Sequence, residues 1–227
     1  MAEALRIAIV GAESTGKSTL AAALAAALAQ PGGPRVAWVP ELLREWCSRV
    51  GRTPQAHEQP GILRAQHERI EAAAEAHDIV VCDTTALMTA VYSRLLFDDR
   101  SLDTRAMQLH GRVALTLLTA LDLPWVPDGL QRDGPQVREP VDSLLRQLLL
   151  AHRVPFAVVG GVAEARTRQA MAAVAPLLRP ADGSDTQPGL FTRLEARAGS
   201  GGGATRPRRA WACECCLGDY ERALRRG

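Results

Sequence analysis

The chain has 227 residues, 47% of them hydrophobic and 23% charged, which is an ordinary composition for a globular protein. This length supports one substantial hydrophobic core and is shorter than two domains usually need. The net charge of +2 is too small to indicate binding to nucleic acid or to an anionic membrane surface, so we expect neither as a partner.

The first half of the chain predicts strands that alternate with helices. The apolar, β-branched run 6–10 is typical of a buried strand, and the alanine-rich segment 17–29 is typical of a helix. After a Pro/Gly break, the sequence predicts a second strand at 35–41 and a short helix at 41–51. Another Pro/Gly break precedes a long polar helix at 61–77.

The second half continues the same alternation. In chain order, the sequence predicts a strand at 78–85, a helix at 86–97, a helical stretch ending near Gly111, a strand at 113–122, a loop or lid at 123–140, a helix at 141–152, a strand at 154–161 and a helix at 162–178.

This alternation indicates an α/β fold of three layers, in which helices cover both faces of a five-stranded parallel sheet. The strands are continuous apolar runs, as expected for strands buried on both faces. From Arg179 onward the composition changes to that of a linker. We therefore expect a globular domain at 1–178, followed by a flexible linker and a cysteine-containing tail at 179–227.

The turn after the first strand has the phosphate-binding pattern G-x-x-x-x-G-K-[ST]. Its glycines let consecutive backbone N–H groups point at phosphate oxygens, and the next helix presents its positive end to the same anion. Lys17, the only lysine among 27 basic residues, is expected to reach the β- and γ-phosphates, and Ser18 to coordinate Mg²⁺. The residues predicted to bind a nucleoside triphosphate are Gly11, Ala12, Glu13, Ser14, Thr15, Gly16, Lys17, Ser18 and Thr19.

Two carboxylates follow strands that end at the same edge of the predicted sheet. Asp83 follows the apolar run IVVC, where it could serve Mg²⁺ or act as general base, or else cap the next helix. Glu41 follows the second predicted strand and is a candidate base or acceptor ligand, with Arg44 one turn later as an anion or substrate contact. The alternative for Glu41 is a solvated helix start.

The segment 123–140 combines loop-forming residues with Arg132 and Arg138. Phosphoryl transfer needs water excluded and positive charge near the transferred group, and a lid that carries arginines supplies both. The alternative is an ordinary surface loop. Trp38, Trp46 and Trp125 could stack on an acceptor ring or could pack in the core.

Four segments appear in an order that resembles a known family: GAESTGKSTL, WVPELLREW, HDIVVCDTTALMTAVYS and LDLPWVPDGLQRDG. They are similar to the nicotinamide riboside kinase domain of NadR-type proteins and to its stand-alone AAA-like ATPase and kinase relatives. The resemblance spans residues 6 to about 175. It implies a kinase-type P-loop fold with strand order 2-3-1-4-5.

The resemblance also implies an activity. The expected reaction is transfer of phosphate from ATP, with Mg²⁺, to the 5′-hydroxyl of nicotinamide riboside, which yields nicotinamide mononucleotide for NAD synthesis. Carried over by position, Gly11–Thr19 would bind ATP, Asp83 would serve Mg²⁺ or act as base, and Asp128, Gly129 and Arg132 would belong to the lid. A nucleoside-like acceptor is thus what the resemblance implies; the sequence itself does not name the acceptor, which could also be another nucleoside or a vitamin alcohol.

The tail contains three cysteines, Cys213, Cys215 and Cys216, of which the first and third have C-x-x-C spacing. A closed zinc site needs four ligands, so it would require a second copy of the chain, as in a homodimer, or a carboxylate from Glu214 or Asp219. A redox pair and uncommitted thiols are the alternatives.

No apolar run is long enough to span a bilayer, and the N-terminal segment MAEALRIAIVG lacks the basic start and cleavage site of a signal peptide. We therefore expect a cytoplasmic protein with reduced cysteines. Two functions compete at this stage: an ATP-dependent small-molecule kinase, and an ATP-binding switch whose tail docks a partner.

Overall fold

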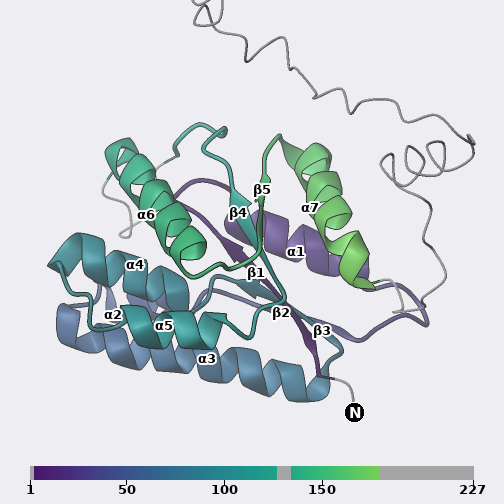
Figure 1. The fold of residues 1–227 in the computed structure, drawn as a ribbon, viewed down its shortest axis with the longest axis horizontal. Helices are drawn as coiled ribbons and strands as arrows, with labels where there is room; N and C mark the ends of the chain where they lie inside the picture. The colour runs from purple at the N-terminus through teal and green to yellow at the C-terminus, as the bar shows by residue number, and fades with distance from the viewer. Residues whose placement is uncertain (1–2, 127–133, 179–227) are drawn as a thin grey trace, which may run out of the picture. The chain divides into compact units, whose positions relative to one another are not determined.

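The computed structural model describes residues 3–126 and 134–178, which form a five-stranded, fully parallel sheet (Figure 1). The strand order is β2-β3-β1-β4-β5, so the predicted fold class and the order 2-3-1-4-5 are confirmed. The strands are β1 (Leu5–Val10), β2 (Val36–Val39), β3 (Ile79–Asp83), β4 (Leu115–Thr119) and β5 (Phe156–Val159).

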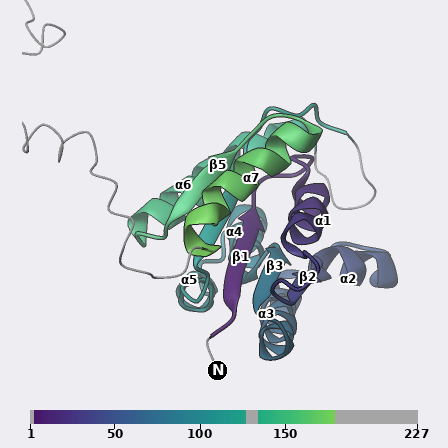
Figure 2. The same ribbon diagram turned by 90° about the vertical axis from the view of Figure 1, so that its right-hand side faces the viewer.

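Helices cover both faces of the sheet, as the continuous apolar strands predict (Figures 1 and 2). Helices α1 and α7 pack on one face, where Leu24 and Val174 meet Ile7 and Ile9 of β1. Helices α3, α4 and α6 supply the apolar cover of the opposite face. The helices are α1 (Lys17–Leu28), α2 (Leu42–Val50), α3 (Gln59–Ala76), α4 (Ala86–Phe97), α5 (Asp103–His110), α6 (Arg138–Ala151) and α7 (Ala163–Leu178), with short 3-10 turns at Ala56–Glu58 and Pro135–Val137.

Two helices begin earlier than the sequence predicts. Helix α3 begins at Gln59 and carries Pro60 within its first turn, where a missing N–H costs no helical hydrogen bond. Helix α6 begins at Arg138, so this arginine lies on a helix and the predicted lid loop is wrong over its last residues. Both differences move a polar side chain from an expected loop into an ordered helical start.

Parallel strands bring their carboxyl ends to one edge, and this edge collects the turns that follow β1, β2 and β3. Among the described residues, no helix is both long and apolar enough to cross a membrane. The last described element ends at Leu178, so the predicted linker and tail at 179–227 lie outside the described residues.

One buried histidine connects three elements behind this edge. The Nδ1 atom of His110 lies 2.9 Å from the Oγ1 atom of Thr85, and its Nε2 atom lies 2.8 Å from the Oγ1 atom of Thr116 on β4. Burial lowers the pKa of His110 from 6.5 to about 4. The ring is therefore neutral in the folded protein at neutral pH.

This histidine predicts a loss of stability in mild acid. Below pH 6.5 the unfolded chain binds a proton at His110 that the folded chain excludes, so the free energy of unfolding falls with pH until the folded pKa near 4 is reached. Between pH 6.5 and 5 the loss from this group is about 2 kcal/mol. Urea unfolding at several pH values measures it, and His110→Gln should flatten the dependence by that amount. An unchanged slope in the variant would contradict the assignment.

Candidate functional site

The phosphate-binding turn is shaped by two glycines with positive φ. Gly11 has φ +150°, and a Cβ atom there would lie 2.0 Å from the Oγ1 atom of Thr119 on the neighbouring strand. Gly16 has φ +75° and is the residue from which α1 begins. The first glycine therefore permits close contact with β4, and the second permits the turn into the helix.

Side-chain hydroxyl groups hold this turn in place. The Oγ1 atom of Thr15 donates to the backbone oxygen of Ala12 at 2.7 Å and lies 2.7 Å from the Oγ1 atom of Thr119. The Oγ atom of Ser14 donates to the backbone oxygen of Val126 at 2.8 Å, which connects the turn to the segment after β4. The turn is therefore linked to both neighbouring segments of chain.

Lys17 lies at the start of α1 with its side chain buried. Its Nζ atom donates to the backbone oxygen of Ala12 at 2.9 Å. Burial lowers the pKa of Lys17, and the charges of Glu41 and Asp83 oppose that shift. The ammonium is thus placed among acidic groups at the carboxyl edge of the sheet.

Asp83 ends β3 and is almost fully buried. The first residue after it, Thr84, has a φ of +69°, which is strained for a β-branched residue. The Oγ1 atom of Thr85 then accepts the backbone N–H of Leu87 at 3.3 Å and caps α4. Thr85 therefore performs the capping that the sequence left open for Asp83.

The carboxylate of Asp83 suits a cation site. Burial raises the pKa of Asp83, while hydrogen bonding from Ser18 and the charge of Lys17 lower it. Its Oδ1 atom is buried and has no hydrogen-bond partner. A buried carboxylate oxygen beside a serine hydroxyl is the oxygen donor set that Mg²⁺ prefers, so Ser18 and Asp83 fit the predicted ion.

Glu41 lies between β2 and α2 and is buried, which rules out the solvated helix start considered for it. Its side chain makes no capping hydrogen bond to α2. Its Oε2 atom lies 3.9 Å from the Nε atom of Arg44, whose side chain is about half exposed. The two residues form an ion pair at the wall of a cavity.

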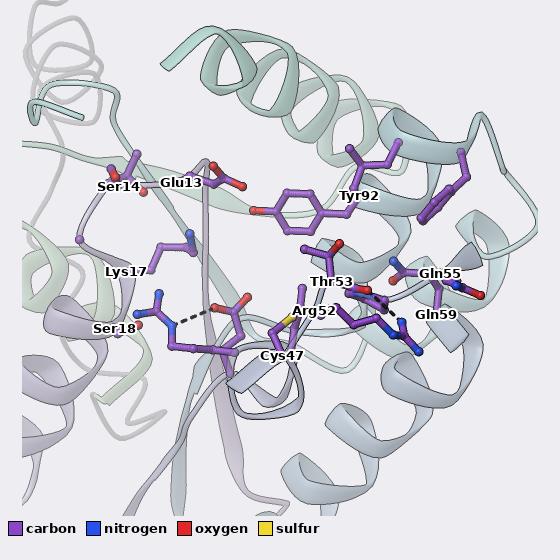
Figure 3. Close-up of a pocket in the computed structure, with 18 of the residues that line it drawn as sticks. Glu13, Ser14, Lys17, Ser18, Cys47, Arg52, Thr53, Gln55, Gln59 and Tyr92 are labelled. Atoms are coloured by element: carbon purple, nitrogen blue, oxygen red, sulfur yellow. Dashed lines mark hydrogen bonds and ion pairs between the residues drawn. The ribbon is translucent and has the colours of Figure 1, made fainter. Parts of the chain in front are cut away.

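That cavity has a volume of about 640 Å³ and extends from the phosphate-binding turn toward α2, α3 and α4 (Figure 3). Its lining includes Lys17 and Ser18 at one end and Gln55 and Gln59 at the other. In Figure 3, Tyr92 lies between these two ends. The volume is typical of a small-molecule site.

The far end of this cavity could not be read from the sequence. The aromatic side chains in its lining are Tyr92 and Phe97 of α4, and none of the three tryptophans considered from the sequence contributes. Trp46 instead packs against Arg52, whose Cζ atom lies 5.2 Å from the centroid of the Trp46 ring. Gln59 was missed because Pro60 and Gly61 suggest a chain break there.

A buried arginine on α7 holds the phosphate-binding turn from the other side. Arg166 donates to the backbone oxygens of Thr15 and of Gly161, the latter at 2.8 Å from its Nε atom. It also forms an ion pair with Asp122, the third residue after β4. Because these partners come from three separate turns, the sequence offers no local signal for this residue.

The two predicted lid arginines have different outcomes. Arg132 lies outside the described residues. Arg138 is buried on the first turn of α6, and its Nε and Nη2 atoms have no hydrogen-bond partner. Helix α6 precedes the parallel strand β5, so its first turn lies at the carboxyl edge of the sheet. Arg138 does not line the 640 Å³ cavity, and its role stays a prediction.

The predicted zinc ligands Cys213, Cys215 and Cys216 also lie outside the described residues. Within residues 3–126 and 134–178, no group of three or more His, Cys, Asp or Glu side chains could hold a metal ion. The two cysteines in this part, Cys47 and Cys82, are free and buried. Nothing in the described structure supports zinc.

A glycine-framed turn after β1, strand order 2-3-1-4-5 and a carboxylate at the end of β3 together define a P-loop kinase fold. A family model described as an AAA domain matches residues 6–166. The chain therefore belongs to this AAA domain family. A search of curated protein sequences gives no match.

Solved structures share the fold. A crystal structure of NadR protein in complex with NR superimposes with a TM-score of 0.60 at 20% sequence identity, over 76% of this chain and 50% of that one. A thymidylate kinase from Ehrlichia chaffeensis superimposes with a TM-score of 0.52 at 16% identity, over 78% of this chain and 100% of that one. The chain thus spans about half the length of the NadR chain, and the fold implied by its NadR-type motifs is confirmed.

The Gly11 contact generates a stability prediction. Gly11→Ala should lower the free energy of unfolding by about 2–4 kcal/mol, because the new Cβ collides with Thr119 and the backbone φ is strained. Urea unfolding measures this loss in the parent chain and in a Thr119→Ala background, where the Oγ1 atom that the new Cβ would meet is absent. The loss should be clearly smaller in the second background, and equal losses would disprove the contact.

Proposed function

We propose that the protein transfers the γ-phosphate of ATP to a hydroxyl group of a nucleoside-like small molecule, with nicotinamide riboside as the specific acceptor. The observation that carries this proposal is the 640 Å³ cavity, which begins at the phosphate-binding turn and continues past Glu41 to Gln59. A site that only bound and released nucleotide would not need this additional cavity beside the phosphates. The fold shared with NadR protein, solved in complex with NR, supports the choice of acceptor.

ATP would bind with its phosphates on residues 11–18 and its nucleoside on the opposite side of the turn. A second groove of about 910 Å³ begins at Gly16 and Thr19 and runs between α1 and α7. Leu20, Leu123 and Met171 give it apolar walls. An apolar groove next to the phosphate site suits a flat base, which leaves the cavity on the other side for the acceptor.

Mg²⁺, when bound, neutralises charge on the phosphates and orients them for in-line transfer. Ser18 and Asp83 would hold it, since the buried Oδ1 atom of Asp83 has no protein partner. Lys17 would exchange its hydrogen bond with the Ala12 carbonyl for contacts with the transferred phosphate. All three side chains project from the same edge of the sheet.

Glu41 would act as general base, because it lines the acceptor cavity whereas Asp83 does not. In this step the acceptor hydroxyl oxygen forms a bond to the γ-phosphorus and the bond from that phosphorus to the β,γ-bridging oxygen breaks. The hydroxyl proton passes to Glu41, and ADP leaves with the bridging oxygen. Arg44, whose Nε atom lies 3.9 Å from the Oε2 atom of Glu41, would hold the carboxylate in position.

The second function considered from the sequence is an ATP-binding switch with a partner-docking tail. Its partner would bind residues 179–227, which lie outside the described structure. The kinase proposal is favoured by the acceptor cavity, and one experiment separates the two.

Purified protein with Mg-ATP should convert nicotinamide riboside to a phosphorylated product. Chromatography of the product and release of ADP measure this conversion. Lys17→Ala should lower kcat by about 10³-fold, because the charge developing on the transferred phosphate loses its ammonium. ATP turnover that no riboside, nucleoside or vitamin alcohol accelerates would favour the switch.

Arg138 offers a separate test of the proposed transfer. Its guanidinium has two buried nitrogens without partners, which an anion could satisfy. Arg138→Ala should lower kcat by about 10²-fold or more, and Arg138→Lys should restore only part of it, because one ammonium cannot replace a planar fork. A matched control is Arg64→Ala on α3, whose exposed side chain pairs with Glu68 and lines neither the cavity nor the groove. Equal activity of Arg138→Ala and this control would remove Arg138 from the mechanism.

A further inference from the structure

We infer that Gln59 selects the acceptor, and that the substrate class is a riboside whose ring carries an amide edge: an N–H and a C=O group side by side, as in a carboxamide or a lactam. This inference rests on the proposed function, because it takes the 640 Å³ cavity as the acceptor site.

The observation on which this inference rests is the buried side-chain amide of Gln59, whose oxygen has no hydrogen-bond partner. The side chain of Gln59 is 1% exposed and lines the cavity, and its Oε1 atom has no hydrogen-bond partner. Burying an amide oxygen without a partner destabilises the folded state. Such a group at a cavity wall is best explained by a ligand that supplies the missing donor.

A second glutamine on the same helix provides the comparison. Gln66 is 2% exposed, and its Oε1 atom accepts the backbone N–H of Leu42 at 2.7 Å, while its Nε2 atom donates to the backbone oxygen of Pro40 at 3.4 Å. Gln66 therefore satisfies its amide within the protein. On the same helix, Gln66 therefore has a structural role, whereas Gln59 is left to bind a ligand.

Contacts of the preceding residues fix the backbone position of Gln59. Helix α3 begins at this residue, directly after the 3-10 turn Ala56–Glu58. Glu58 accepts two hydrogen bonds from Arg52, at 2.7 and 2.8 Å, and one from the backbone N–H of Gln55 at 2.8 Å. The Arg52 guanidinium also lies over the Trp46 ring. A preorganised amide discriminates between ligands better than a mobile one.

The position of Gln59 indicates how the substrate would lie in the cavity. Figure 3 shows Lys17 at one end of the cavity, Gln59 at the other and Tyr92 between them. The reacting hydroxyl must approach the phosphates beside Lys17 and Glu41. The ring of a riboside then extends toward Gln59, alongside the aromatic side chain of Tyr92.

The amide of Gln59 offers one acceptor and two donor N–H groups in a single plane. A ring with an adjacent N–H and C=O pairs with both at once. A ring carboxylate would present only acceptors to Oε1, and an unsubstituted ring would leave Oε1 desolvated and unpaired. The site should therefore reject the acid and the unsubstituted ring.

The test compares four ribosides with the full chain: nicotinamide riboside for a carboxamide, uridine for a lactam, nicotinic acid riboside for a carboxylate, and pyridine riboside for an unsubstituted ring. The wild type should favour one amide-edged riboside over the last two by at least about 10-fold in kcat/KM. Which of the two it favours identifies the carboxamide or the lactam. Gln59→Leu should erase this preference, mainly through KM.

Thermal unfolding excludes a structural explanation. Gln59→Leu should leave Tm unchanged or raised, because it removes an unsatisfied buried oxygen, whereas Gln66→Leu should lower Tm and leave the ratio between acceptors unchanged. A preference that survives Gln59→Leu, or a fall in Tm like that of Gln66→Leu, would overturn the inference.

Calorimetric titration of the same ribosides, in the presence of a non-hydrolysable ATP analogue, separates this inference from the proposed function. Selective binding without turnover refutes the kinase activity and supports the role of Gln59. Turnover without selectivity does the reverse, and absence of riboside binding refutes both.

Discussion

The structure is organised around a positive charge that water scarcely reaches. Lys17 is buried, and burial alone would favour its neutral form. The charges of Glu41 and Asp83 oppose that shift, and the Ala12 carbonyl accepts a hydrogen bond from the ammonium. These groups come from the turns after β1, β2 and β3, so the arrangement exists only when the parallel sheet has formed.

The same requirement explains the order of elements. In a parallel sheet every strand delivers its following turn to one edge, and the strand order places β3 directly beside β1. Asp83 thereby comes next to the phosphate-binding turn although 65 residues or more separate it from that turn in sequence. Helices on both faces then exclude water from the sheet without covering the edge.

Local sequence was sufficient for one half of the site. The glycine spacing, the strand before it and the helix after it all lie within 24 residues, so 6–29 predicts its own conformation. Asp83 and Glu41 could be proposed because each follows an apolar strand. The other half depends on tertiary packing. Gln59 and Tyr92 line a cavity whose walls come from separate helices, and Arg166 contacts Thr15 and Asp122, which are both far from it in sequence. No local pattern distinguishes these side chains from ordinary helical residues.

Arg166 has a further consequence for how the protein meets its nucleotide. By holding the Thr15 carbonyl from outside, it fixes the peptide planes of the turn before any phosphate arrives. The conformational entropy of that turn is therefore lost during folding and is not subtracted from the binding free energy. In the proposed reaction, the free energy of triphosphate binding would then be available to move Lys17 away from the Ala12 carbonyl and to align the attacking oxygen.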